Sequence, residues 1–262
     1  MPSLATKPVL VLIHGAWHTP DNLVKLTQAL RASDFEVHTP RLLSVNGARP
    51  PNADLSTDTD LVRSYVSSLV EAGRNVVVIM HSYGGQVGTN ALHGLSAKSR
   101  SATGLKGGVT HLIYLCAFAL PESGTMAAKI DEFGHGDLVP LTFDIAEDGT
   151  MQPRDPKAIF LGEDLGESNE KEVGEYLGKL VLWNGACPRM PVTAPVAAWR
   201  EIPVAYVYCT KDMTVPFDYQ KSMVALMEKE GTKVRTFTLE TGHIPNLTAT
   251  KDVVRIVEEV VG

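Results

Sequence analysis

Three residues of the types that together perform nucleophilic acyl transfer occur here in a suggestive order: Ser82, Asp212 and His243. Each lies just after a short apolar run rich in Val, Ile, Leu and Tyr. A serine hydroxyl becomes a nucleophile when a histidine removes its proton, and an acid keeps that histidine in the correct tautomer. The three residues therefore predict a triad with Ser82 as nucleophile, His243 as general base and Asp212 as the orienting acid.

A sharp turn between a strand and a helix is indicated at residues 80–85, which read Met-His-Ser-Tyr-Gly-Gly. Such a turn exposes the serine hydroxyl above a sheet, and small neighbours let the backbone turn tightly. The glycine usual two residues before the serine is replaced by Met80, whereas Gly84 and Gly85 are present. Alone, this pattern also fits a Gly-rich turn with an incidental serine. It lacks the G-x-G-x-x-G of a dinucleotide-binding turn.

Two backbone amides are candidates for an oxyanion hole. Acyl transfer needs N–H groups aimed at the developing oxyanion, one from the residue after the nucleophile and one from a loop after an early strand. Tyr83 fits the first place. Ala16 fits the second, because residues 14–17 read His-Gly-Ala-Trp and follow an apolar run. An ordinary strand-to-helix turn would explain the same four residues equally well.

Asp212 and His243 each have a simpler alternative when taken alone. A single aspartate after a strand is most often a solvated turn residue, and a single histidine is often a surface or core residue. The order along the chain and the place of each residue after a strand favour the triad. None of the other seven histidines forms H-E-x-x-H or another close metal-ligand pair on a helix. We therefore expect no metal and no cofactor.

The elements that must position these residues alternate between strand and helix. Such alternation predicts an α/β fold with a doubly wound, mostly parallel six-stranded sheet, whose functional loops follow the carboxyl ends of the strands. Continuously apolar runs are typical of strands buried on both faces. The expected strands are 9–13, 35–39, 76–80, 111–116, 204–209 and 234–239, and the expected helices are 20–32, 57–72, 86–95, 217–230 and 249–260.

One interval of 82 residues, 119–200, interrupts this alternation. It is rich in proline and contains one clear helical pattern, at 169–183, with Asn169 and Glu172 resembling a capping pair. An unstructured loop of this length is improbable in a compact domain. We expect a small inserted lid at 119–200, and a catalytic core formed by 1–118 and 201–262.

Composition excludes several classes of protein. The chain has 262 residues, 44% hydrophobic and 21% charged, with a formal net charge of −6. Disordered chains have fewer apolar residues, and nucleic-acid binders usually carry a basic surplus. Three widely spaced cysteines indicate no disulfide framework, and neither a signal peptide nor a membrane span is recognisable. We expect a cytoplasmic protein that binds a small ester or lactone and neither nucleic acid nor membrane; a homodimer stays open.

These motifs resemble the α/β-hydrolase superfamily, and more narrowly its small-lid branch of plant methylesterases and hydroxynitrile lyases. The similarity is carried by residues 14–17, 81–85, 209–220 and 242–247, and it spans 8–96 and 202–260. It is faint in the expected lid. The resemblance implies the α/β-hydrolase fold with Ser82, Asp212 and His243 as the triad.

Two positions help to separate esterases from lyases within that branch. The similar lyases carry a threonine straight after the first motif histidine and a lysine straight after the catalytic histidine. Here these positions are Gly15 and Ile244, which favours an esterase. Related epoxide hydrolases and dehalogenases use an aspartate nucleophile, which Ser82 argues against.

We therefore predict a serine hydrolase that cleaves a small carboxylic ester through an acyl-enzyme. A lactonase, a thioesterase or an acyl-transfer cyclase would share the same triad, and a lyase or a ligand-binding receptor are further alternatives. An apolar pocket is expected between the sheet edge and the lid. Its candidate walls, each of which core packing would explain equally well, are Trp17, His81, Phe118, Leu120 and Trp183.

Overall fold

The computed structural model describes residues 7–262. Residues 1–6 lie outside the described residues. The expected core begins within this segment, and so does the N-terminal stretch in which no signal peptide was recognised. The main sheet has six strands in the order β2-β1-β3-β4-β8-β9, and every neighbouring pair is parallel. The predicted fold class is confirmed. The strands are β1 (Val9–Ile13), β2 (Val37–His38), β3 (Asn75–His81), β4 (Gly108–Leu115), β8 (Val204–Cys209) and β9 (Val234–Leu239).

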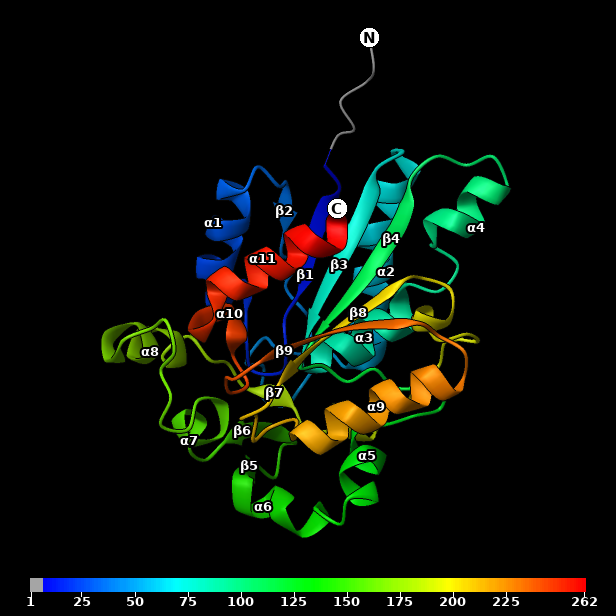
Figure 1. Ribbon diagram of the computed structural model, residues 1–262. Helices are drawn as coiled ribbons and strands as arrows, with labels where there is room; N and C mark the ends of the chain where they lie inside the picture. Colours follow the sequence, from blue (N-terminus) through cyan, green and yellow to red (C-terminus); the bar gives the residue numbers. More distant parts are fainter. Residues whose placement is uncertain (1–6) are drawn as a thin grey trace.

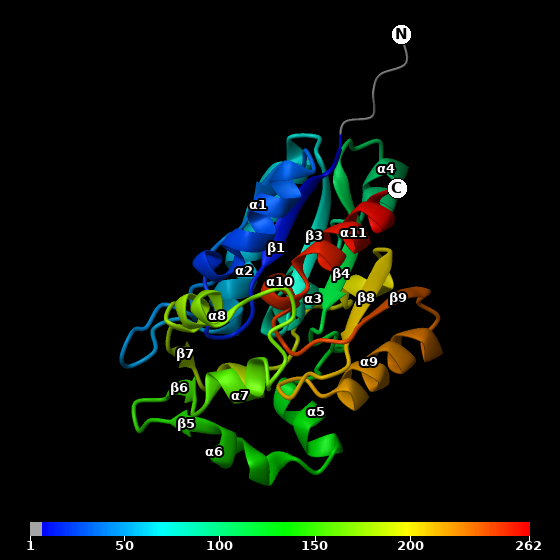
Figure 2. The same ribbon diagram turned by 60° about the vertical axis from the view of Figure 1, so that its left-hand side comes forward.

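Helices cover both faces of this sheet, which explains why β1 and the middle of β3 are continuously apolar. In β1, Val11 and Ile13 belong to one hydrophobic cluster, and Leu10 and Leu12 belong to another on the opposite face. Helices α2 (Leu55–Glu71), α3 (Tyr83–Ala91) and α9 (Phe217–Lys229) contribute to the first cluster, and α1 (Val24–Ala32) and α11 (Thr250–Val261) contribute to the second. Figures 1 and 2 show α1 and α11 side by side over one face. Burial on two faces leaves no solvent-facing position for a polar side chain.

The five helices expected in this part of the fold are present, and two short helices, at Ala97–Ala102 and Pro245–Thr248, were not expected. The helices are α1 (Val24–Ala32), α2 (Leu55–Glu71), α3 (Tyr83–Ala91), α4 (Ala97–Ala102), α9 (Phe217–Lys229), α10 (Pro245–Thr248) and α11 (Thr250–Val261), with a 3-10 turn, η1 (Pro20–Leu23), before α1. The helix expected at 86–95 begins three residues earlier, directly after Ser82. Within residues 7–262, no helix combines the length and apolar character needed to cross a membrane.

Between β4 and β8 the chain forms a small layer of its own beyond one end of the main sheet (Figures 1 and 2). It contains an antiparallel sheet in the order β5-β6-β7. The elements are α5 (Met126–Glu132), α6 (Val139–Thr142), β5 (Phe143–Ile145), β6 (Thr150–Pro153), α7 (Pro156–Phe160), α8 (Glu170–Leu177) and β7 (Trp183–Asn184), with 3-10 turns η2 (Gly136–Leu138), η3 (Cys187–Arg189) and η4 (Ala198–Arg200). The expected lid lies in this interval, and its boundaries at 119 and 200 stay a prediction.

The single helix expected in this interval is partly wrong. The capping pair is present, because the Asn169 side chain accepts from the Glu172 N–H and the Glu172 carboxylate accepts from the Asn169 N–H. However, α8 ends at Leu177, with Gly178 as its C-cap. Trp183 lies on β7, where it pairs with Met151. Apolar residues that follow a helix can either extend the helix or form a strand. Here residues 183–184 form a strand because they pair with β6.

Candidate active site

Ser82 lies on a sharp turn between β3 and α3. Its backbone has φ 54° and ψ −123°, a left-handed conformation that L-residues rarely adopt. The turn needs a glycine at position 84, because a Cβ there would lie 2.5 Å from the carbonyl oxygen of Ile13. The side chain of Ser82 is almost fully buried and borders the main cavity of the protein. The expected strand-turn-helix element is therefore present.

Three loops bring Ser82, His243 and Asp212 into one chain of hydrogen bonds. The Nε2 atom of His243 lies 2.9 Å from the Ser82 Oγ, and its Nδ1 atom lies 2.7 Å from Asp212 Oδ2. The other carboxylate oxygen of Asp212 accepts from the N–H groups of Thr214 and Val215, at 2.7 and 2.8 Å. With one oxygen held in this way, Oδ2 is left to accept Nδ1–H. His243 Nε2 is then free to accept the serine proton.

The two expected oxyanion donors come from the residue after Ser82 and from a loop that borders the same cavity as Ser82. Tyr83 is the first residue of α3, so its N–H precedes the first intrahelical hydrogen bond. Ala16 lies in the loop after β1 and borders the same cavity as Ser82. The backbone of Gly15 comes close to Ser82, since a Cβ at position 15 would lie 2.9 Å from the Ser82 Cβ.

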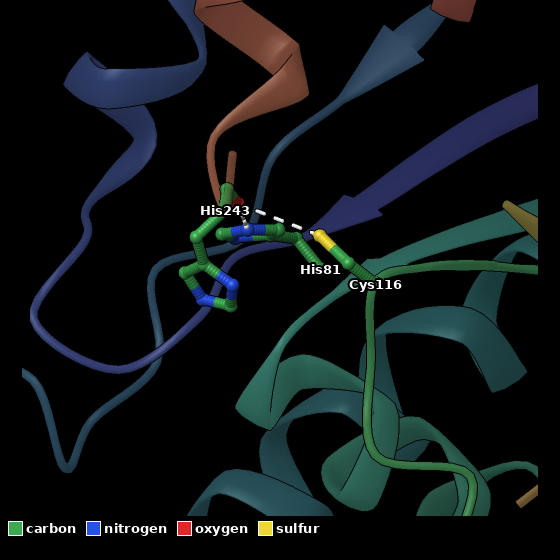
Figure 3. A group of neighbouring side chains, drawn as sticks. All are labelled: His81, Cys116 and His243. Carbon is green, nitrogen blue, oxygen red and sulfur yellow. Dashed lines mark hydrogen bonds between the residues drawn. The ribbon is translucent and has the colours of Figure 1, made fainter. Parts of the chain in front are cut away.

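The loop that carries His243 is fixed from beneath by two buried side chains. His81 Nε2 lies 2.6 Å from the backbone oxygen of His243, and the thiol of Cys116 contacts the same oxygen at 3.4 Å. Figure 3 shows both side chains directed at this carbonyl group. His81 was expected in the pocket wall, and this expectation is wrong, because its ring points under the catalytic loop and does not border the cavity.

His81, Cys116 and His243 also form a group whose ligand atoms all lie within 4.8 Å of one another (Figure 3). The chemistry of this group does not fit a metal ion. Burial raises the pKa of the Cys116 thiol well above its usual range, so the sulfur keeps its proton. Both ring nitrogens of His243 are already bonded to Ser82 and Asp212. We therefore assign these contacts to hydrogen bonding alone.

Three buried histidines around the site are held neutral. Burial lowers the pKa of His14 to about 4 and that of His18 to about 3, and it lowers the pKa of His81 well below its usual value. Proximity to His243 lowers the values of His18 and His81 further. At neutral pH these rings add no positive charge beside the imidazole of His243.

The segment between β4 and β8 touches the triad directly. The N–H of His243 donates to the backbone oxygen of Phe160 at 2.7 Å, and the two rings lie 5.7 Å apart. The hydroxyl of Thr214, two residues after Asp212, donates to the backbone oxygen of Ile159. Nothing in the sequence signalled these contacts, because backbone acceptors in a loop carry no residue signature.

An apolar cavity of about 340 Å³ opens beside Ser82. Of the expected walls, Trp17, Phe118 and Trp183 border it. Leu120 does not, which corrects that prediction; its side chain is buried, and its backbone oxygen accepts from the indole of Trp199. Sequence reasoning missed most of the lining contributed after β4, which includes Met126, Ile130, Val139, Phe143, Met151 and the charged Asp131 and Arg189.

The two tryptophans turn only apolar surface toward this cavity. The indole N–H of Trp17 donates to the backbone oxygen of Met151, and that of Trp183 donates to the hydroxyl of Ser44. Their rings meet edge to face at 5.3 Å. Phe143 stacks on Trp17 at 5.1 Å. Because the polar atoms of both indoles are bonded within the protein, this wall suits an apolar group of a ligand.

A family model described as "Alpha/beta hydrolase family" matches residues 10–256. The chain belongs to the alpha/beta hydrolase family. The hydrolase is 26% identical over 259 residues to alpha/beta hydrolase nvfD of Aspergillus novofumigatus, covering 98% of this chain and 97% of that relative. It is 30% identical over 260 residues to a probable hydrolase of Phoma sp., covering 98% and 99% of the two chains.

Solved structures share the fold of this hydrolase at low identity. A pyrethroid hydrolase from Sphingobium faniae has a TM-score of 0.72 and 19% identity, with 97% of each chain covered. A mutant of polyneuridine aldehyde esterase has a TM-score of 0.72 and 14% identity, with 97% and 98% covered. These structures confirm the fold, and the family model confirms the α/β-hydrolase superfamily; the protein is an enzyme of this hydrolase family. The resemblance to the plant esterase branch bears on the proposal below.

Proposed function

We propose that this hydrolase cleaves small carboxylic esters that carry an apolar acyl or aryl group, through an acyl-enzyme on Ser82. The observation that carries the proposal is the unbroken series of hydrogen bonds from Ser82 Oγ through His243 to Asp212. It lies beside a cavity whose lining is largely apolar.

The reaction proceeds in two steps. His243 Nε2 takes the Ser82 proton while Oγ bonds to the ester carbonyl carbon, and the N–H groups of Ala16 and Tyr83 stabilise the oxyanion. The intermediate collapses, and His243 gives its proton to the departing alcohol. Water, deprotonated by the same nitrogen, then attacks the acyl-enzyme and releases the acid. Asp212 keeps the imidazole in its productive tautomer and stabilises the imidazolium.

The surroundings of the nucleophile support hydrolysis over cyanohydrin cleavage. A threonine in place of Gly15 would have no room, because its Cβ would lie 2.9 Å from the Ser82 Cβ and 3.0 Å from His81 Nδ1. The side chain of Ile244, at the position of the lyase lysine, is fully buried in the hydrophobic core. Gly15 and Ile244 therefore offer no side chain that could hold cyanide beside Ser82.

The test combines active-site labelling with a substrate panel. We expect a fluorophosphonate probe to label the wild-type protein at Ser82 and to leave Ser82→Ala unlabelled. Turnover of p-nitrophenyl esters, matched lactones and thioesters is then compared by mass spectrometry. Ester turnover that disappears in Ser82→Ala, with an unchanged circular dichroism spectrum, supports the proposal. Turnover in Ser82→Ala close to that of the wild type contradicts it, and so does an unlabelled wild-type protein that hydrolyses no ester.

A further inference from the structure

Asp58 is a fully buried carboxylate on α2 that the triad does not use. Its Oδ1 accepts from the N–H of Ser44 at 3.0 Å, and its Oδ2 accepts from the Ser44 hydroxyl at 2.5 Å and the Tyr83 hydroxyl at 2.8 Å. All of these donors are neutral groups. A buried carboxylate is costly to desolvate, so a buried one without a cationic partner calls for a structural reason.

The hydrogen bond between Tyr83 and Asp58 is the first link, and it connects the carboxylate to the proposed oxyanion hole. Tyr83 supplies a proposed oxyanion amide with its backbone, and the far end of its side chain is held by Asp58. Burial keeps the pKa of the Tyr83 phenol well above its usual value, so the hydroxyl remains a donor. Both residues are shielded from water, which makes the hydrogen bond to the carboxylate stronger than it would be at the surface.

The second link leads to the pocket wall. The Ser44 hydroxyl donates to Asp58 and accepts from the indole N–H of Trp183 at 3.1 Å. The rings of Trp183 and Tyr83 lie 4.8 Å apart, so the two links also touch each other. One carboxylate thus joins α2, the loop after β2, the start of α3 and strand β7.

The strained backbone at Ser82 is a physical reason for the hydrogen bonds that Asp58 makes. A residue held at φ 54° and ψ −123° is strained and persists only where its surroundings enforce this conformation. Gly85 and Phe118 restrain Ser82 from one side by donating to its backbone oxygen. The residue that follows Ser82 is restrained from the other side through its side chain, by Asp58.

We propose that Asp58 is a positioning residue, which fixes the Tyr83 amide for the oxyanion and Trp183 for the bound acyl group through one shared set of hydrogen bonds. This inference rests on the proposed function, because it assumes that Tyr83 N–H binds the oxyanion. Asp58 itself touches no substrate and acts only through Tyr83 and Ser44.

Tyr83→Phe tests the inference, since it removes the hydroxyl but keeps the ring and the backbone amide. A trifluoromethyl ketone forms a tetrahedral adduct with Ser82 whose oxyanion needs the hole, whereas the matched methyl ketone measures ground-state binding. We expect kcat and affinity for the trifluoromethyl ketone to fall together by about tenfold, less than the 10²–10³-fold loss on removing a donor outright. KM and affinity for the methyl ketone should stay within about twofold.

Thr89→Val is the matched control. It removes another buried hydroxyl on α3, whose 2.7 Å hydrogen bond to Tyr114 does not involve Asp58. It should lower the melting temperature without changing the affinity ratio of the two ketones. Ser44→Ala, which cuts the Trp183 link, should shift that ratio in the same direction as Tyr83→Phe and also raise KM for esters with bulky acyl groups.

The outcomes separate this inference from the proposed function. An unchanged ketone ratio in Tyr83→Phe, or a ratio equal to that of Thr89→Val, overturns the role of Asp58 while wild-type ester hydrolysis stands. A wild-type protein that neither hydrolyses esters nor binds the trifluoromethyl ketone overturns both. A selective loss of trifluoromethyl ketone affinity in Tyr83→Phe and Ser44→Ala, absent from Thr89→Val, supports it.

Discussion

The thioether sulfur of Met80 occupies the space in which a Cβ at position 88 would lie. Met80 ends the apolar part of β3, two residues before Ser82, and Gly88 lies one and a half turns into α3. Glycine inside a helix is unfavourable by about 1 kcal/mol relative to alanine. The two residues explain each other, because the absence of a side chain at position 88 makes room for methionine where this turn usually has glycine.

Replacing Gly88 with alanine should therefore destabilise the protein. We expect Gly88→Ala to lower the free energy of unfolding by about 1–3 kcal/mol through overlap with the Met80 side chain. Met80→Ala alone should cost about 2–5 kcal/mol because it leaves a cavity. The double variant should cost clearly less than the sum, as residues in contact do not add. Urea unfolding of the four proteins measures this, and strict additivity would contradict the contact.

Asp212→Asn should reverse the tautomer of the catalytic histidine. The N–H groups of Thr214 and Val215 hold one oxygen of residue 212, so the amide NH₂ of asparagine would face His243 Nδ1. Nδ1 must then accept, Nε2 carries the proton, and it cannot take one from Ser82. We expect kcat to fall by about 10⁴-fold with little change in KM. Asp218→Asn, at an exposed carboxylate on α9, is the control and should keep wild-type kcat.

Gly15→Ala should impair the reaction more than the fold. The added Cβ would press on Ser82 and His81, displacing the nucleophile from His243. Misplacing a reacting group by about 1 Å costs about 10²-fold in rate, so a loss of this order in kcat is expected. Gly174→Ala is the matched control, because nothing lies within 4 Å of a Cβ at that helical position. Equal ester turnover by both variants would refute the close approach.

Lowering the pH should destabilise the protein already at pH values above those at which carboxylates titrate. The pKa of His14 is about 4 and that of His18 about 3 in the folded protein, and that of His81 is also strongly lowered. In the unfolded chain all three histidines have a pKa of about 6.5. The unfolded state therefore binds more protons below that pH, and stability present at neutral pH is lost as the pH falls.

Near pH 5, His14 and His18 alone make the difference almost two protons, which corresponds to a slope of about 2.5 kcal/mol per pH unit, and His81 acts in the same direction. Urea unfolding between about pH 7 and pH 5 measures the slope, before salt-bridged carboxylates contribute. His18→Gln should reduce this slope by about one proton's share, roughly 1.3 kcal/mol per pH unit. A flat stability profile over this range would show that these histidines are not buried in the neutral form.

The sequence by itself determined the main sheet and the order along the chain of the three residues of the proposed triad. Strand and helix periodicity are local properties of the chain, and a serine at a strand end keeps that place in any packing of the sheet. The six expected strands, Ser82, Asp212 and His243 could therefore be located from residue types and spacing. Trp17, Phe118 and Trp183 could be named as pocket candidates but not distinguished from core residues.

Only the tertiary structure decided which side chains share the site. The His81 side chain lies beneath the loop of His243 and that of Leu120 packs into the core, although His81 precedes Ser82 and Leu120 follows the cavity residue Phe118 by two positions. Phe160 and Asp58 carry no motif, and they reach the site because remote segments pack against it. Packing depends on contacts between residues far apart in sequence, and no local pattern encodes which distant partner a buried side chain will meet.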